Sequence, residues 1–232
     1  MRFWKLATSA PRPVNSLACV AAGSLVFKIV VLNRFSSLFP GAYRLGLIFE
    51  GLLASIIASY VFYLVVVRFK EQSDFQALYP YVSKHSKIVV RECSDQLKDI
   101  SKEAGRNLDL VSVDEKSIEE AFKNISPHSQ APLVLDQLGT YANWFQYFHY
   151  HRERSLRSVR KLFDQLKFLE AEHIILVTSV DDCSHFAMLD ILQSLRVKNS
   201  DLSAWAKTFY SYCVCCRELE FYNRKLDRFE NL

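Results

Sequence analysis

Two long apolar segments near the N-terminus constrain the fold of this chain more than any other feature. The first runs from about Val14 to Leu32 and reads VNSLACVAAGSLVFKIVVL. The second runs from about Leu45 to Val67 and reads LGLIFEGLLASIIASYVFYLVVV. A helix needs about 20 mainly apolar residues to cross the hydrocarbon core of a bilayer. The pattern therefore predicts two transmembrane helices, over residues 14–32 and 45–67.

The link between these segments, residues 33–44, is short and contains the turn pair Pro40 and Gly41. So short a link makes the two helices antiparallel neighbours. We therefore expect residues 1–70 to form a transmembrane hairpin with its turn at Pro40 and Gly41, and residues 71–232 to form a separate domain.

The basic residues around the two segments predict an orientation. Residues 1–70 contain eight Lys or Arg and one acidic residue, whereas residues 71–232 contain 21 basic and 24 acidic residues. Basic residues concentrate on the cytoplasmic side of membrane proteins. The link holds only Arg34 and Arg44, and five basic residues flank the outer ends of the hairpin: Arg2, Lys5, Arg12, Arg68 and Lys70. Both termini are therefore expected in the cytoplasm.

Each apolar segment carries one charge, Lys28 in the first and Glu50 in the second. The two residues are equally distant from the turn, so a hairpin places them at similar depth. A charge inside a bilayer is costly alone and usually pairs or faces a cavity. We expect an ion pair between the helices, with separate extension of each side chain to the interface as the alternative.

Small residues recur in the second segment at steps of four. Ala54 and Ala58 form one row, and Ser55 and Ser59 form another. Such rows allow helices to approach closely in a membrane. They fit packing within one hairpin, and they equally fit self-association into a homo-oligomer.

The remainder of the chain has the pattern of a helical bundle. Apolar residues at steps of three and four predict an amphipathic helix across Leu156 to Leu169. Further helices are expected over about Phe75–Ala104, ended by Gly105, and over 114–124, begun by a capping box at Ser112. We also expect helix over about 201–230 and in the apolar segment HIILVTSV. The predicted fold class is all-α, a hairpin followed by a cytoplasmic bundle.

No catalytic or nucleotide-binding motif is present in the sequence, and we expect no enzyme activity, cofactor, metal or small-molecule substrate. His149 and His151 are two apart, so a helix directs them differently. Asp181 and His185 make only two ligands, and a closed zinc site needs four. Cys213, Cys215 and Cys216 lack a second pair, and the six cysteines are expected as free thiols.

One segment combines aromatic and basic residues. Aromatic side chains recur from Tyr141 to Tyr150, and basic side chains follow. Such a surface can grip nucleic acid, anionic lipid or an acidic protein, and it can also be a solvated helix face over an aromatic core. The candidate docking residues are Trp144, Arg152, Arg154, Arg157, Arg160 and Lys161.

The segment FPGAYRLGLIFEGLLASIIASYVFYLVVVRF, Phe39 to Phe69, resembles a hairpin in small bacterial accessory proteins of anti-phage systems that have two transmembrane helices. The most similar group is the membrane effector proteins of bacterial retrons. The resemblance covers roughly the first third of the chain, and beyond it only the helix-rich layout agrees.

The resemblance implies a toxic effector of abortive infection. A reverse transcriptase with its bound RNA–DNA product would hold the cytoplasmic domain in check, and release would let the hairpins perturb the inner membrane. Two other classes remain open on the sequence alone. One is a non-catalytic membrane anchor or adaptor, and the other is a membrane-tethered enzyme that uses polar residues among His149, His151, Asp181, Asp182 and His185.

Overall fold

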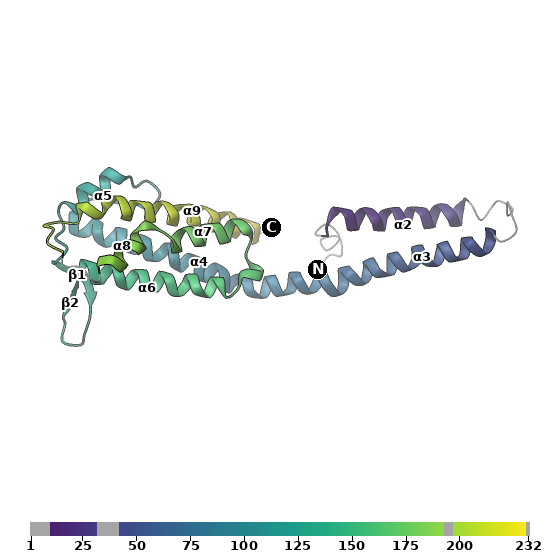
Figure 1. The fold of residues 1–232 in the computed structure, drawn as a ribbon, viewed down its shortest axis with the longest axis horizontal. Helices are drawn as coiled ribbons and strands as arrows, with labels where there is room; N and C mark the ends of the chain where they lie inside the picture. The colour runs from purple at the N-terminus through teal and green to yellow at the C-terminus, as the bar shows by residue number, and fades with distance from the viewer. Residues whose placement is uncertain (1–9, 32–41, 193–196, 231–232) are drawn as a thin grey trace. The chain divides into compact units, whose positions relative to one another are not determined.

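A computed structural model describes residues 10–31, 42–192 and 197–230, and these residues are mostly helical (Figure 1). This confirms the predicted helical class, with a two-stranded sheet as the exception. The chain divides into two compact units, Met1–Ala77 and Leu78–Leu232. The division falls inside one long helix, later in the chain than the boundary expected at residue 70.

The first unit contains two antiparallel helices, α2 (Arg12–Val30) and α3 (Ala42–Phe62). Proline stands in the first turn of α2, where a missing N–H costs no helical hydrogen bond. The expected turn at Pro40 and Gly41 lies outside the described residues. After α3 the helix continues through a π-helical segment, η2 (Tyr63–Arg68), into α4 (Phe69–Ala104).

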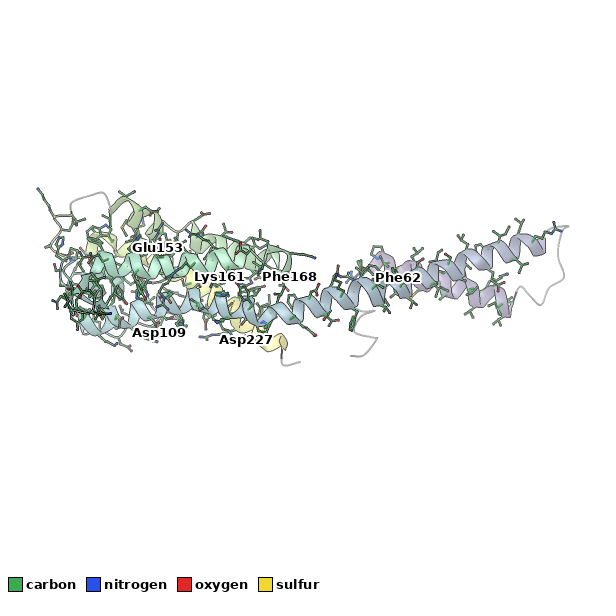
Figure 2. The ribbon with its side chains drawn as sticks, turned by 90° about the horizontal axis from the view of Figure 1, so that it is seen from below. Phe62, Asp109, Glu153, Lys161, Phe168 and Asp227 are labelled. Atoms are coloured by element: carbon green, nitrogen blue, oxygen red, sulfur yellow. The ribbon has the colours of Figure 1, made fainter. Side chains whose placement is uncertain are left out.

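The helices of the first unit expose their apolar side chains. In the most apolar windows of Arg12–Val30 and Arg44–Ala104, only 17% and 11% of the residues are buried. Leu52 and Phe62 are 58% and 65% exposed, and Figure 2 shows Phe62 on this apolar stretch. A core helix of a water-soluble protein hides such residues. By length and composition both helices can cross a membrane, which indicates membrane association.

The second unit is a bundle of helices around one core. It contains the C-terminal part of α4 and five further α-helices: α5 (Glu115–Phe122), α6 (Trp144–Phe163), α7 (Ala171–Asp181), α8 (Ser184–Leu192) and α9 (Ala206–Glu230). Short 3₁₀ turns, η3 (Leu166–Phe168) and η4 (Ser203–Trp205), follow α6 and precede α9. Helix α9 packs against α5, α7 and α8.

Aromatic residues fill the centre of this bundle. Trp144, Phe122, Phe209 and Tyr212 are at most 1% exposed. The ring centroids of Phe122 and Phe209 are 5.4 Å apart, within the range of favourable aromatic pairs. The first part of the expected stripe points into this core through Leu156, Val159 and Leu162. The helix expected to Leu169 instead ends at Phe163, and Leu166 beyond it is 48% exposed.

A β-hairpin is the main departure from the helical expectation. Strands β1 (Gln130–Val134) and β2 (Tyr141–Asn143) pair antiparallel, with an irregularity between the pairs Gln130–Asn143 and Val134–Tyr141. The sequence predicted an all-α fold and no strand, and this was wrong for Gln130–Val134 and Tyr141–Asn143. The hairpin forms because Gly139 adopts a positive φ of 84° in the turn, which glycine tolerates without a steric penalty.

The observed helix ends agree in part with those predicted from the sequence. Gly105 follows α4 with a φ of 64°, as expected for a glycine that ends a helix. The segment HIILVTSV lies in α7, which confirms helix there. Asp114 caps α5 by accepting a hydrogen bond from the N–H of Ser117, so the expected capping residue, Ser112, was wrong.

Candidate functional site

Two polar contacts join the helices of the first unit. Nζ of Lys28 in α2 pairs with Oε2 of Glu50 in α3. The hydroxyl of Tyr60 in α3 donates to Oδ1 of Asn15 in α2 at 2.6 Å. Lys28 is only 8% exposed, although its neighbours on the helix are apolar and exposed. The structure thus places the two charges of the apolar segments together, as expected from the sequence.

The small residues of α3 lie mainly on its outer surface. Ala54, Ser55, Ala58 and Ser59 are exposed in the single chain. Ser55 and Ser59 also line a small cavity of about 270 Å³ that α2 borders through Ala18. Contact with α2 therefore leaves the alanine row uncovered.

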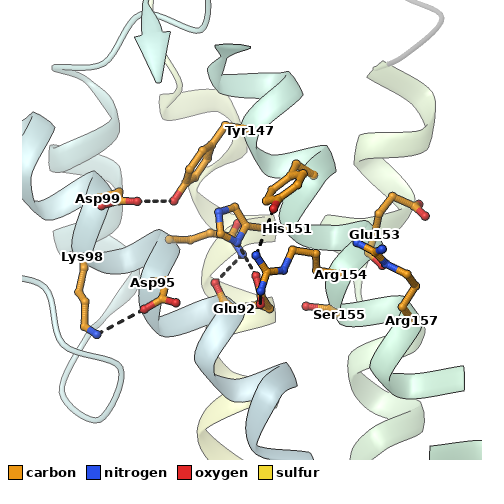
Figure 3. A network of polar contacts seen from close by, with 12 residues as sticks. Glu92, Asp95, Lys98, Asp99, Tyr147, His151, Glu153, Arg154, Ser155 and Arg157 are labelled. Carbon is orange, nitrogen blue, oxygen red and sulfur yellow. Dashed lines mark hydrogen bonds and ion pairs between the residues drawn. The ribbon is translucent and has the colours of Figure 1, made fainter. Parts of the chain in front are cut away.

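A charged network lies between α4 and α6 in the second unit (Figure 3). Glu92 is 1% exposed, and its Oε2 is 2.7 Å from Nδ1 of His151. Its Oε1 forms an ion pair with Nη2 of Arg154 at 3.0 Å. A buried carboxylate needs such partners because desolvation of an isolated charge is costly. Arg154 also stacks on Tyr150 and donates to its hydroxyl at 3.1 Å.

One turn away along α6 and two turns away along α4, the same two helices form a second polar contact. The hydroxyl of Tyr147 donates to Oδ2 of Asp99 at 2.8 Å (Figure 3). Burial, together with this hydrogen bond to a carboxylate, raises the pKa of Tyr147 far above its usual range. The ring of Tyr147 packs on His151, with 4.5 Å between centroids. These contacts fix the α4–α6 interface and hold α6 in one rotation about its axis.

That rotation decides which candidate docking residues face outward. Trp144 is fully buried in the core, so its indole cannot stack on a partner. Arg152 is largely covered, and its guanidinium pairs with Asp190 at 2.6 Å and with Glu153 at 3.0 Å. Arg154 is held by Glu92. The residues of this set left exposed on one face of α6 are Arg157, Arg160 and Lys161.

Lysine from α4 extends this basic surface. His85 of α4 is buried, and burial followed by the charges of Lys161 and Lys84 lowers its pKa. Lys84 precedes His85 in α4, and both Lys84 and Lys161 are exposed. We name Lys84, Arg157, Arg160 and Lys161 the basic face of the bundle.

A buried serine, histidine and asparagine meet between α4, α7 and α9. The hydroxyl of Ser86 donates to Oδ1 of Asn223 at 2.7 Å and lies 3.0 Å from Nε2 of His173. Because the only hydroxyl proton goes to Asn223, the imidazole donates to Ser86. A nucleophilic serine needs the reverse, with histidine as the proton acceptor. Burial lowers the pKa of His173 to about 4, and the contact serves to hold the helices together.

The other polar residues considered from the sequence lie apart from one another. His151 faces Glu92, whereas His149 borders a surface groove. Asp181 ends α7 and His185 lies in α8, so no single helix presents both. His185 is enclosed by aromatic rings, and burial lowers its pKa to about 3. The sequence did not indicate that His173 and His185 would be core residues.

The cysteines are free, and several gather in the core. Sγ of Cys93 in α4 lies 3.8 Å from Sγ of Cys213 in α9, and burial raises the pKa of Cys93 well above its usual value. Within the described residues, no group of three or more His, Cys, Asp or Glu side chains is arranged to hold a metal ion. The C-x-C-C motif therefore contributes mainly small core side chains.

Comparison with known proteins gives no relative: no protein-family model, curated protein or solved structure matches this chain.

Proposed function

We propose that this chain is a membrane-embedded toxic effector of an abortive-infection system, with a hairpin in the bacterial inner membrane and a helical bundle in the cytoplasm. The observation that carries the proposal is the exposed apolar surface of α2 and α3 around the Lys28–Glu50 pair, in which the lysine is covered. The charge bias at the ends of the hairpin supports cytoplasmic termini. The resemblance of Phe39 to Phe69 to retron effector hairpins supports the defence role.

The polar contacts suggest how such a hairpin perturbs a membrane. Within one hairpin Lys28 and Glu50 compensate each other, which lowers the cost of placing both in lipid. The exposed Ala54 and Ala58 row offers a surface for a second hairpin to approach closely. Association would bring several Lys28–Glu50 pairs together, and exchange of partners among them would open a polar route for ions.

The test is induced expression of the full chain without its genomic neighbours, followed by growth and a voltage-sensitive dye. The wild-type chain is expected to depolarise the membrane and arrest growth. The matched variant Lys28→Leu with Glu50→Leu keeps an apolar hairpin without charges, and we expect at least about tenfold less leak at equal membrane abundance. Unchanged potential with the wild-type chain, at an abundance confirmed in the membrane fraction, would contradict the effector role.

Inhibition requires a docking surface on the bundle, and we assign it to the basic face. The expected partner is a reverse transcriptase with its RNA–DNA product. Because the second unit carries no overall basic excess, protein contacts are expected to dominate. Reversal of Arg157, Arg160 and Lys161 to Glu should release the partner in a pull-down and should raise toxicity. The control reverses Lys98 and Lys102, which lie on α4 and are 67% and 79% exposed.

A membrane anchor or adaptor is the second candidate, and the same basic face favours it, since a docking surface serves recruitment as well as inhibition. The two candidates differ in what they require of the hairpin. Replacement of residues 14–67 by an unrelated two-helix hairpin leaves an adaptor functional. It abolishes depolarisation by an effector. Retained function after the exchange would support the adaptor and overturn the effector.

A further inference from the structure

The β1–β2 hairpin projects from the bundle as an arm (Figure 1). An isolated two-stranded hairpin is at best marginally stable in water. The turn of this one is nevertheless well defined. Oδ1 of Asp136 accepts hydrogen bonds from the N–H of Leu138 at 2.9 Å and of Thr140 at 3.0 Å. The N–H of Leu135 donates to the carbonyl of Thr140 at 2.8 Å. The arm is therefore a shaped element that is held out into solvent.

The tip of the arm carries exposed apolar side chains among the exposed polar residues Asp136, Gln137 and Thr140. Leu138 is 93% exposed, and Val134, Leu135 and Tyr141 are about half exposed. A single exposed leucine needs no explanation, but several exposed apolar side chains on one short arm offer a surface for interaction. Leu138 forms the projecting knob of that surface.

A groove that fits such a knob lies at the base of the same arm. Its volume is about 970 Å³, and most of its lining is apolar. Strand β1 contributes Leu133, and the chain just after it contributes Leu135; Phe145 comes from α6, and Leu189 and Leu192 come from α8. Leu135 belongs both to the groove and to the exposed apolar residues of the arm, so the groove reaches the arm at this residue.

We propose that two copies of this chain associate through these surfaces, with Leu138 of each copy seated in the groove of the other. A two-fold contact needs two complementary features on one protomer, and this unit carries a projecting leucine on the arm and an apolar groove at the base of the arm. Charge also fits a second copy. Asp136 is the only charged residue within 130–143, and Lys198 at the groove has no ion pair among the described residues. The acid of the groove, Glu153, is already paired with Arg152.

This inference does not rest on the proposed function, because it concerns the bundle and its arm alone. If the chain is an adaptor, association of two copies would give the assembly two docking surfaces. An effector would gain a means to bring hairpins together, since linked segments meet at high effective concentration. Failure of the membrane assay would leave the arm–groove contact standing, and failure of the contact would leave the membrane assay unaffected.

The experiment uses the full chain in detergent micelles, with a photo-crosslinking phenylalanine analogue at position 138. Equal amounts of ¹⁴N and ¹⁵N protein are mixed before irradiation, so that mass spectrometry separates contacts between copies from contacts within one. We expect mixed-isotope adducts that join position 138 to the groove segments 145–153 or 184–192. The absence of adducts, adducts within one copy only, or adducts outside the groove would overturn the proposal. Capture of another protein in place of a second copy, when cells are irradiated, would also overturn it.

Two substitutions measure the strength of the contact. Leu138→Asp places a charge on the knob, and we expect self-association to weaken about tenfold or more, as the loss of one buried leucine implies. Lys198→Glu should weaken it less, by opposing Asp136 of the other copy. The matched control is Phe221→Asp on α9, since Phe221 is 51% exposed and lies outside the groove. Equal self-association of Leu138→Asp and Phe221→Asp, in folded protein, would contradict the proposal.

Discussion

The two compact units place apolar and charged residues in opposite ways. In the first, Leu52 and Phe62 face outward while Lys28 is covered. In the second, Trp144 and Phe209 are buried while Arg157 and Lys161 face outward. Both units are mainly helical, so the difference lies in the side chains, and it suits their exteriors to different solvents. An apolar exterior is stable in lipid and costly in water.

Both units nevertheless place a charge pair between two helices, and the pairs differ in burial and in kind. The Glu50 side chain is 37% exposed, whereas that of Glu92 is 1% exposed. In the first unit Lys28 and Glu50 are the only charges of their apolar segments, and they form an ion pair with each other. In the second unit Glu92 has two partners, His151 and Arg154, and a neighbouring contact between Tyr147 and Asp99. In lipid, pairing lowers the free-energy cost of inserting a charge. In a protein core, pairing fixes the rotation of a helix about its axis.

The largest effect is expected from removing both partners of Glu92. His151→Leu with Arg154→Leu leaves a buried carboxylate uncompensated, and we expect a loss of about 3–5 kcal/mol in the free energy of unfolding. Urea titration in mild detergent, followed by the fluorescence of buried Trp144, measures it. Addition of Glu92→Leu should recover most of the loss. If the triple variant is as unstable as the double, the cost comes from packing and the comparison of the two charge pairs fails.

The contrast in solvent is tested most directly by placing the same charge on each exterior. Phe62→Asp and Phe221→Asp both replace a phenylalanine that is more than half exposed, 65% and 51% respectively. In lipid the change costs about 3 kcal/mol, so Phe62→Asp should reduce the carbonate-resistant membrane fraction strongly. In water an exposed change costs within about 0.5 kcal/mol. If Phe62→Asp and Phe221→Asp reduce the membrane fraction equally, the two exteriors do not face different solvents.

The Lys28–Glu50 pair predicts a smaller, non-additive effect. Lys28→Leu leaves Glu50 without its partner in the membrane, and we expect a destabilisation of about 2 kcal/mol. The double variant, Lys28→Leu with Glu50→Leu, should insert better than the single variant. Membrane abundance after alkaline extraction distinguishes them. A double variant that inserts no better than the single variant would show that the residues act separately and extend to the interface.

Acid should weaken the bundle through its buried histidines. Burial lowers the pKa of folded His173 from the ordinary 6.5 to about 4, so the unfolded chain binds this proton first as the pH falls. The stabilising contribution is present at neutral pH and declines below about pH 6.5. Between pH 7.5 and 5.5 the free energy of unfolding should fall by about 1.4 kcal/mol through this residue.

The matched variant is His173→Gln, which keeps a donor toward Ser86 without a titrating group. Its unfolding free energy, measured by urea titration across the same pH range, should fall less steeply than that of the wild-type chain. His185, whose pKa burial lowers to about 3, should still contribute in both proteins. If the unfolding free energies of the two proteins fall equally steeply with decreasing pH, His173 is not the group responsible.

The pattern of residues was sufficient for the helical class and for several helix ends. Gly105 ends α4 because a glycine at positive φ is a local property. The stripe through Leu156, Val159 and Leu162 faces the core because helical spacing alone groups those residues. The β-hairpin was missed, since its turn depends on hydrogen bonds to one carboxylate, Asp136, and its strands are short.

The docking segment shows the limit of the same reasoning. Trp144 and Arg157 belong to one aromatic and basic run, and their types alone give no reason to separate them. The rotation of α6 separates them, and partners on α4, Glu92 and Asp99, set that rotation. Residues fifty or sixty positions away in the chain thus decide which side chains of the aromatic and basic run are available to a partner.

The sequence by itself determined that two segments are apolar over the length of a membrane span, that one charge interrupts each, and that helices follow. These properties depend on composition and on spacing along the chain. Only the tertiary structure decided that His151 faces Glu92, that Trp144 lies in the core, and that Leu138 projects beside an apolar groove. The physical reason is that burial and pairing arise from contacts between distant segments, which no local pattern encodes.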